Sequence, residues 1–223
     1  MTIARVDAVV RDRAARSLGR AHDRIHRTAA AMLARRGAAG TLLDAGCGTG
    51  DLWRLVSDRF TACTGVDAVR YDGLPPDVTF VAANLDGPLP LADASVDTAA
   101  AIEVIEHLEN PRAFVRELAR VTRPGGWIAV TTPNQLSALS LLCLATKGVF
   151  VAFQDGDYPA HRTALLEIDL RRIAAECGLD EVAIEYTKWG RVPFTPWHYP
   201  AAIAGVVPRR FSDNLVMIAR RCA

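Results

Sequence analysis

Apolar residues occur in short continuous blocks along the first two thirds of the chain, and polar, glycine-rich or proline-rich turns separate the blocks. Short apolar runs bounded by turn residues are typical of strands that are buried on both faces. By this criterion we expect five strands, at residues 41–45, 62–67, 78–83, 95–104 and 127–133. Helical periodicity at residues 51–60 and 111–126 predicts helices between them. This alternation predicts an α/β fold with a doubly wound, mostly parallel sheet.

The last third of the chain departs from this alternation. The pattern of residues 164–179 predicts a helix that ends at Gly178. The patterns of residues 181–189 and 213–221 predict two further strands, which brings the expected sheet to seven strands. The segment between those strands, residues 190–212, contains four prolines. A connection this long is uncommon unless it has a role of its own, so we expect it to cover a site or meet a partner.

Length and composition are those of one globular domain. The chain has 223 residues, 50% of them hydrophobic and 23% charged, with a formal net charge of +1, which excludes a disordered chain and a general polyanion binder. Residues 1–36 hold nine arginines against three aspartates. We interpret them as a solvated helix, with contact to nucleic acid or acidic lipid as the alternative. Its buried face would comprise Ile3, Val6, Val9, Val10, Leu18, Ile25, Met32 and Leu33.

Five widely spaced cysteines without a C-x-x-C pair predict a reduced, cytoplasmic protein, and we see no secretory leader. The longest apolar stretch, residues 136–153, is interrupted by Lys147 and Gly148. Because it is short and broken, we expect no membrane span there. A buried helix, or one that covers a hydrophobic substrate, is our prediction for it.

A glycine-rich turn, "DAGCGTGD", follows the first expected strand and precedes a helix. Such a turn lies at the carboxyl edge of a parallel sheet, where α/β proteins bind ligands. Its spacing is G-x-G-x-G and it contains no lysine or arginine, so a phosphate fits poorly and a ligand with a cationic centre and an amino-acid tail fits better. Asp67, 21 positions after Gly46, can accept hydrogen bonds from both hydroxyls of a ribose.

Residues 41–133 resemble the class I S-adenosylmethionine-dependent methyltransferases in this loop, in Asp67 and in the stretch "ANLDGPLPLADASVDTAAAIEVIEHLENP". The resemblance implies a Rossmann-like methyltransferase fold with an antiparallel last strand and S-adenosylmethionine as cofactor. It implies that the methionine part of the cofactor contacts Asp44, Gly46, Cys47 and Gly48, and that the ribose and the adenine edge contact Asp67 and Ala68. It also implies that the adenine ring contacts Asn84 and Leu85, and that the sulfonium end faces Glu103 and Val104.

The sequence "EVIEH" places Glu103, Glu106 and His107 at the end of the fourth expected strand. If the chain turns helical after Glu103, the i, i+3 and i+4 spacing puts all three side chains on one side. His107 suits a general base, and two carboxylates with an imidazole suit a divalent ion such as Mg²⁺. A structural alternative is that Glu106 and His107 cap the following helix.

This E-x-x-E-H is similar to the metal-binding motif of the ubiquinone-biosynthesis O-methyltransferases and the small-RNA 2′-O-methyltransferases. In both families another histidine after the fifth strand lies near the metal, and His161 stands at a comparable place. The resemblance therefore implies His107, Glu106 and His161 as catalytic residues, with Glu103 completing a metal set. RNA 2′-O-methylation is one alternative function, and a non-catalytic cofactor-binding regulatory protein is another.

Other histidines and aromatic residues are candidates for the acceptor side. His22 and His26 have the i, i+4 spacing of a helical metal pair but no evident third ligand, so we expect solvated or lid-lining histidines. Four aromatic residues could stack on an acceptor or pack against the sheet: Trp189, Phe194, Trp197 and Tyr199.

Taken together, we expect one methyltransferase domain. Residues 1–36 would form a helical lid, 37–134 the cofactor-binding core, and 135–223 the acceptor-side insertions and final strands. Segments 135–163 and 189–211 would close over a small-molecule acceptor, with a hydroxyl oxygen preferred because a base or metal is what a hydroxyl requires. We expect no nucleic-acid partner, and a monomer or homodimer.

Overall fold

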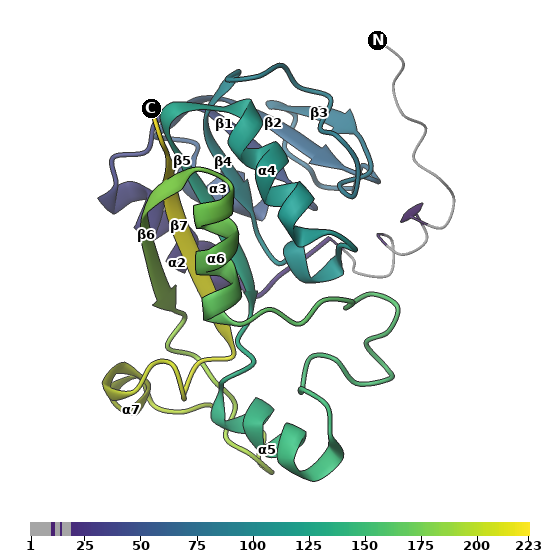
Figure 1. Cartoon of the computed structure of the whole chain (residues 1–223), viewed down its shortest axis with the longest axis vertical. Helices are drawn as coiled ribbons and strands as arrows, with labels where there is room; N and C mark the ends of the chain where they lie inside the picture. The colour runs from purple at the N-terminus through teal and green to yellow at the C-terminus, as the bar shows by residue number, and fades with distance from the viewer. Residues whose placement is uncertain (1–9, 12–13, 15–18) are drawn as a thin grey trace.

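A computed structural model describes residues 10, 11, 14 and 19–223 of the chain. Its centre is one seven-stranded sheet in the order β3-β2-β1-β4-β5-β7-β6 (Figure 1). Strands β1 to β5 are parallel, and β7 is antiparallel to both of its neighbours. The predicted doubly wound, mostly parallel sheet with an antiparallel last strand is confirmed. The strands are β1 (Gly40–Ala45), β2 (Phe60–Asp67), β3 (Val78–Ala82), β4 (Val96–Ala101), β5 (Thr122–Pro133), β6 (Leu179–Tyr186) and β7 (Asn214–Arg221).

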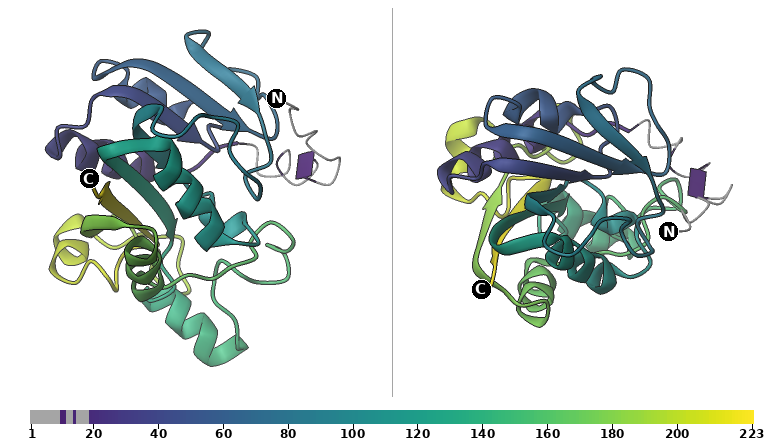
Figure 2. Two further views of the ribbon diagram at one scale, coloured as in Figure 1. Left: turned by 45° about the horizontal axis from the view of Figure 1, so that its top comes forward. Right: turned by 90° about the horizontal axis from the view of Figure 1, so that it is seen from above.

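Helices cover both faces of the sheet (Figure 2). One buried cluster joins the sheet to α2 and α3, through side chains such as Leu33 and Trp53. The other joins it to α4 and α6, through Phe114 and Leu170. The described helices are α2 (Asp23–Arg35), α3 (Asp51–Val56), the short 3₁₀ helix η1 (Ile105–His107), α4 (Pro111–Val121), α5 (Ala138–Lys147), α6 (Glu167–Glu176) and α7 (Ala201–Val206).

Helix α4 illustrates how local signals set an element. The Asn110 side chain accepts a hydrogen bond from the backbone N–H of Ala113, 3.0 Å away, and Pro111 occupies the first turn, where no amide donor is needed. The alternative that Glu106 and His107 cap this helix is therefore wrong, because Asn110 caps it.

The end of β4 differs from the prediction. The strand stops at Ala101 instead of Val104, and Glu103 has a φ of 53°, in the left-handed region. The backbone N–H of Glu103 donates to the Thr131 hydroxyl on β5, 2.7 Å away. This contact holds the chain in a turn at the carboxyl edge of the sheet, before η1 begins.

The N-terminal helix is described only in part. In α2, Ile25, Met32 and Leu33 are buried, as the apolar pattern predicts. Val10 is half-buried. The other four expected positions on that face lie outside the described residues: Ile3, Val6, Val9 and Leu18.

The apolar stretch 136–153 is not a buried helix, so that alternative is wrong. Of the ten residues of α5, only Ser140 and Cys143 are buried, and Leu144 is 38% exposed. Figure 1 shows α5 and α7 together at the foot of the molecule, away from the body of the sheet. We call residues 136–153 and 188–211 the appended lobe. No helix in the described residues is long and apolar enough to cross a membrane.

Candidate functional site

A cavity of about 700 Å³ opens at the carboxyl edge of the sheet, where β1, β2 and β4 end. Its size is in the range of small-molecule and cofactor sites. Of the thirteen site residues that the sequence predicts, all but Gly48 line it. These twelve are Asp44, Gly46, Cys47, Asp67, Ala68, Asn84, Leu85, Glu103, Val104, Glu106, His107 and His161.

Gly48 does not line the cavity but contacts the segment that precedes α2. Its φ is 49°, and a Cβ atom there would lie 2.1 Å from the carbonyl oxygen of Gly19. The Thr49 backbone N–H donates to the same carbonyl, 3.1 Å away. The segment that precedes α2 therefore packs directly on the glycine-rich turn, and only glycine allows this close approach.

Asp67 is held by backbone amides at the end of β2. Its Oδ2 accepts from the N–H of Gly48 at 3.1 Å, and its Oδ1 accepts from the N–H of Ala68 at 2.7 Å. Burial raises the pKa of this carboxyl, and the amide hydrogen bonds oppose that rise. Each oxygen has a second lone pair, so the carboxylate is oriented and can still accept from a ribose. Oδ1 of Asn84 accepts from the backbone N–H of Asp86 at 3.1 Å, and this hydrogen bond fixes the side-chain amide of Asn84.

Asp44 gives the cavity a strongly acidic character. The residue is buried, and burial, followed by the charges of Asp67 and Asp51, raises the pKa of its carboxyl to about 7. A buried carboxyl whose ionised form is disfavoured by two neighbouring carboxylates favours a ligand with positive charge. A sulfonium with an ammonium tail satisfies this requirement better than a phosphate.

Glu103 is directed toward the last strands instead of toward the other residues of the E-x-x-E-H motif. Its Oε1 accepts from the Thr131 hydroxyl at 2.7 Å, and its Oε2 accepts from Nδ2 of Asn214 at 2.6 Å. Burial raises its pKa to about 7, and both hydrogen bonds oppose that rise. The expectation that Glu103, Glu106 and His107 share one helical side fails because the chain turns at Glu103 before η1.

Glu106, His107 and His161 do come together. Each offers a ligand atom, and these atoms lie within 4.8 Å of one another. The two imidazole rings are 4.7 Å apart between centroids. Nδ1 of His107 lies 2.9 Å from the carbonyl oxygen of Ala160, and Nδ1 of His161 contacts the carbonyl oxygen of Ala152. A carbonyl only accepts, so each Nδ1 carries the proton and each lone pair lies on Nε2.

Glu106 is the least satisfied group in this cluster. Its side chain is fully buried, and neither carboxylate oxygen has a hydrogen-bond partner of good geometry among the described residues, although the nearby Thr132 hydroxyl acts to lower the pKa of the carboxyl. Burial raises its pKa well above the ordinary range, and the charge of Glu103 adds to the rise. A buried carboxyl without partners is costly unless a cation or a donor from a ligand reaches it.

The two histidines of the N-terminal segment also line the cavity. His22 is the N-cap of α2, and its Nδ1 accepts from the N–H of Arg24 at 3.2 Å. His26 is buried, its Nδ1 has no hydrogen-bond partner within the described ranges, and burial lowers its pKa. Neither belongs to the group formed by Glu106, His107 and His161. His26 is therefore not a solvated histidine, and both residues border the cavity.

The aromatic residues of the second insertion do not line the described cavity. Trp189 stacks on His198 at 4.0 Å between centroids and carries the Arg24 guanidinium 4.1 Å from its ring. Residues 156–162 of the first insertion do line the cavity. The two expected insertions therefore differ in role, because only the first contributes described residues to the site.

Several contributors were not predicted from the sequence. Gly19 meets the glycine-rich turn, Thr131 and Asn214 hold Glu103, and the carbonyl of Ala160 orients His107. Thr131 carries a weak local signal, because it lies near the end of the fifth expected strand, residues 127–133. The others depend on contacts between segments that lie far apart in the sequence.

Comparison with known proteins agrees with this geometry. The family described as methyltransferase domain matches residues 12–201 of the chain. A protein of Mycobacterium tuberculosis named "Probable S-adenosylmethionine-dependent methyltransferase" is 42% identical over 121 residues, which cover 51% of this chain and 43% of the relative. A ubiquinone biosynthesis O-methyltransferase of Paracidovorax citrulli is 27% identical over 113 residues, which cover 46% of this chain and 48% of the relative. The aligned part thus spans less than half the length of either relative.

A solved structure is similar over the whole chain. It is a chain of the "Complex between the Haloferax volcanii Trm112 methyltransferase activator and the putative methyltransferase", with a TM-score of 0.65, 19% identity and full coverage of both chains. At this identity the likeness shows the fold alone.

Proposed function

This chain belongs to the class I S-adenosylmethionine-dependent methyltransferases, and from that premise we propose that it transfers a methyl group to a hydroxyl oxygen of a small-molecule acceptor. The observation that carries the proposal is the buried Glu106 carboxyl, unpartnered among the described residues, beside His107 and His161 in the same cavity as the glycine-rich turn. A hydroxyl is a weak nucleophile, and this cluster offers what it needs: a base or a site for a Lewis acid.

The glycine-rich turn and the acidic residues beside it support S-adenosylmethionine as the methyl donor. The amide-held Asp67 carboxylate and the acidic Asp44, beside Gly46 in the cavity lining, match a nucleoside with a cationic centre. In this proposal Asp67 binds the ribose hydroxyls, and Asp44 pairs with the positive end of the methionine part. When bound, the cofactor supplies an electrophilic methyl group on sulfur.

His107 is our proposed base. With Nδ1 bonded to the Ala160 carbonyl, its lone pair lies on Nε2 and can take the proton of an acceptor hydroxyl. As His107 takes that proton, the new O–C bond forms in line with the breaking C–S bond, and the C–S electron pair stays on sulfur. The role of the surrounding residues is to align the two reactants, which by itself removes much of the barrier.

A divalent ion is the second form of the same proposal. Glu106 offers two buried oxygens, and the Nδ1 contacts of His107 and His161 to backbone carbonyls are those that orient metal-bound imidazoles. An ion held by these three residues would polarise the acceptor oxygen. Glu103, whose oxygens bond Thr131 and Asn214, lies outside this set.

The test is the variant His107→Ala. We expect it to abolish release of S-adenosylhomocysteine in a screen of hydroxyl-bearing small molecules, with nearly unchanged calorimetric affinity for the cofactor. His198→Ala is the control, because His198 is outside the cavity lining. Equal loss of turnover and cofactor affinity would contradict a catalytic role for His107. Wild-type protein that binds the cofactor and methylates no acceptor would favour the regulatory alternative.

The metal is tested without turnover. Calorimetric titration with Mg²⁺ or Mn²⁺ should give binding to the wild type that Glu106→Gln removes and Glu109→Gln, an exposed neighbour, keeps. No ion binding by the wild type would leave His107 as a base acting alone.

A further inference from the structure

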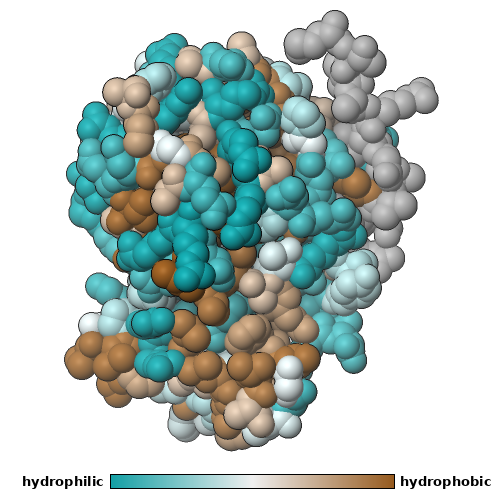
Figure 3. Space-filling model, viewed as in Figure 1, coloured by the Kyte–Doolittle hydropathy of each residue, from teal (hydrophilic) through white to brown (hydrophobic). Residues whose placement is uncertain are grey.

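The appended lobe carries an unusual share of the exposed apolar surface. Nine large hydrophobic side chains are exposed in the described part of the chain, and seven of them belong to the lobe. Figure 3 shows the apolar colour gathered at the foot of the molecule, over α5 and α7, while hydrophilic residues dominate the face above. The seven are Leu144, Val149, Phe194, Trp197, Ile203, Val206 and Val207. A gathered apolar surface of this kind marks an interaction site.

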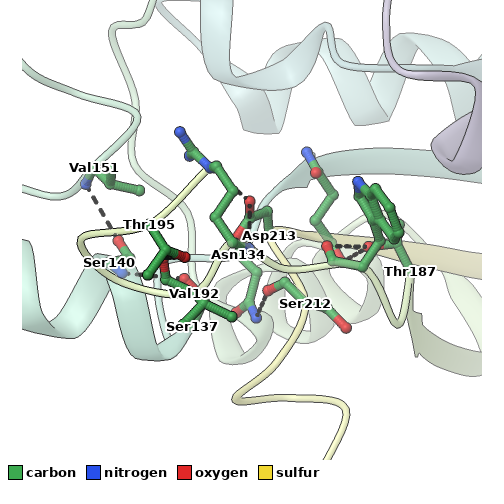
Figure 4. Close-up of polar contacts among 12 residues, drawn as sticks. Asn134, Ser137, Ser140, Val151, Thr187, Val192, Thr195, Ser212 and Asp213 are labelled. Carbon is green, nitrogen blue, oxygen red and sulfur yellow. Dashed lines mark hydrogen bonds and ion pairs between the residues drawn. The ribbon is translucent and has the colours of Figure 1, made fainter. Parts of the chain in front are cut away.

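The lobe is firmly built, so this exposure does not come from a frayed segment. Nδ2 of Asn134 donates to the carbonyls of Arg209 at 2.7 Å and Ser212 at 2.8 Å, which ties the start of α5 to the second insertion (Figure 4). The N–H of Ala138 donates to the carbonyl of Arg210 at 2.8 Å. These contacts make the two insertions one unit.

The tip of the second insertion presents two aromatic rings to solvent. Arg191 and His198 form an antiparallel bridge, and the N–H of Val192 donates to the carbonyl of Trp197 at 2.9 Å, which closes a small hairpin. At its turn Phe194 has a φ of 62°, a conformation that bulky residues rarely adopt. Phe194 is 93% exposed and Trp197 is 71% exposed. The backbone therefore holds both rings outward.

The charge of the lobe has one sign. Residues 136–153 and 188–211 contain five basic residues and no acidic residue, although the whole chain is nearly neutral. Arg191 pairs with Asp213 at 2.8 Å. The other four basic residues are exposed and form no salt bridge with any described residue: Lys147, Lys188, Arg209 and Arg210.

We propose that the appended lobe is a docking surface for the face of an anionic phospholipid bilayer, with Phe194 and Trp197 inserted among the lipid headgroups. Exposed aromatic and aliphatic side chains flanked by basic residues are the signature of segments that lie in a membrane interface. A second copy of this chain fits the surface poorly, because it would set like charges against each other. The surface is separate from the methyl-transfer cavity, which neither ring lines.

The test uses the full chain and sedimentation with vesicles of phosphatidylglycerol and phosphatidylcholine. We expect the wild type to sediment with them, to bind pure phosphatidylcholine vesicles more weakly, and to lose binding as salt rises. Phe194→Ser with Trp197→Ser should weaken binding by about tenfold or more. Ile168→Ser, an exposed apolar residue on α6, is the matched control and should bind as the wild type does. Lys147→Gln with Lys188→Gln should weaken binding to anionic vesicles, and Arg59→Gln, exposed outside the lobe, should not.

Retained affinity for S-adenosylhomocysteine shows that each variant is folded. Quenching of tryptophan fluorescence by brominated lipid should also disappear in Trp197→Phe. Equal sedimentation of the Phe194 and Trp197 double variant and the wild type would overturn the proposal, as would absence of binding to anionic vesicles. Light scattering that shows a dimer lost in the double variant would overturn it in favour of self-association.

Discussion

Replacing Asp44 with asparagine should stabilise the ligand-free protein at neutral and alkaline pH and weaken its binding of the cationic cofactor. Asp44 is buried at the end of β1, and burial, followed by the charges of Asp67 and Asp51, raises its pKa from 3.8 to about 7. Ionisation of Asp44 therefore lowers the free energy of unfolding, because the buried charge is less stable in the native state than in the unfolded chain. Asparagine has nearly the same shape and no charge, so Asp44→Asn removes this cost.

The magnitude follows from the shift. A pKa unit corresponds to about 1.36 kcal/mol, so a rise from 3.8 to about 7 corresponds to about 4 kcal/mol once the group is ionised in both states. Because the folded pKa is the higher one, the native state binds more protons between these values, and stability falls as the pH rises through this window. The cost is about 2 kcal/mol at pH 5 and about 4 kcal/mol at pH 8. Asp44→Asn should thus stabilise the protein by about 2.5 kcal/mol more at pH 8 than at pH 5.

Urea denaturation of the ligand-free wild type and variant at both pH values measures this difference. Calorimetry at pH 8 measures the affinity for S-adenosylmethionine, which should fall in the variant because the carboxylate no longer faces the cationic ligand. A stability difference of the same size at pH 5 and pH 8 would refute the argument from burial of charge. Unchanged cofactor affinity would refute the role of Asp44 in the acidic cavity.

Two further substitutions test the turn and the lobe. Gly48→Ala should lower cofactor affinity by about tenfold or more and reduce the melting temperature, because the new Cβ would lie 2.1 Å from the Gly19 carbonyl oxygen. Gly205→Ala is the control and should change neither quantity, because a Cβ at Gly205 meets nothing within 4 Å. Asn134→Ala should cost about 2–4 kcal/mol of stability by removing three hydrogen bonds, two donated to Arg209 and Ser212 and one accepted from Leu136. Urea denaturation measures that loss, and protease cleavage within residues 136–153 should become faster. Unchanged cleavage would contradict the role of Asn134 in joining the two insertions.

The cofactor side of the protein could be predicted from local patterns. Glycines at fixed spacing after a buried strand specify a tight turn at one edge of a parallel sheet, and Asp67 ends the next strand at the same edge. These features need only nearest-neighbour geometry along the chain, so the sequence contains them. The resemblance to a methyltransferase family then added Asn84 and Leu85, which line the cavity.

The proposed acceptor side depended on contacts that spacing does not encode. The E-x-x-E-H motif suggested three side chains in one direction, but the Thr131 hydroxyl and Asn214 amide hold Glu103 toward β5 and β7. The carbonyl of Ala160, 53 residues beyond His107, sets the orientation of that ring. Partners this distant are brought together only by the packing of the insertion on the sheet.

The sequence by itself determined the α/β alternation, the glycine-rich turn and the type of ligand that the turn can hold, because each follows from side-chain periodicity and backbone freedom within a few residues. Whether an apolar segment is buried is a different question, since burial requires a complementary surface elsewhere in the chain. Residues 136–153 read as a buried helix, yet α5 has no such surface over Leu144 and lies half-exposed at the foot of the molecule (Figure 1). The tertiary structure alone decided that these apolar residues face outward, and that Glu106 meets His107 and His161 in one cavity.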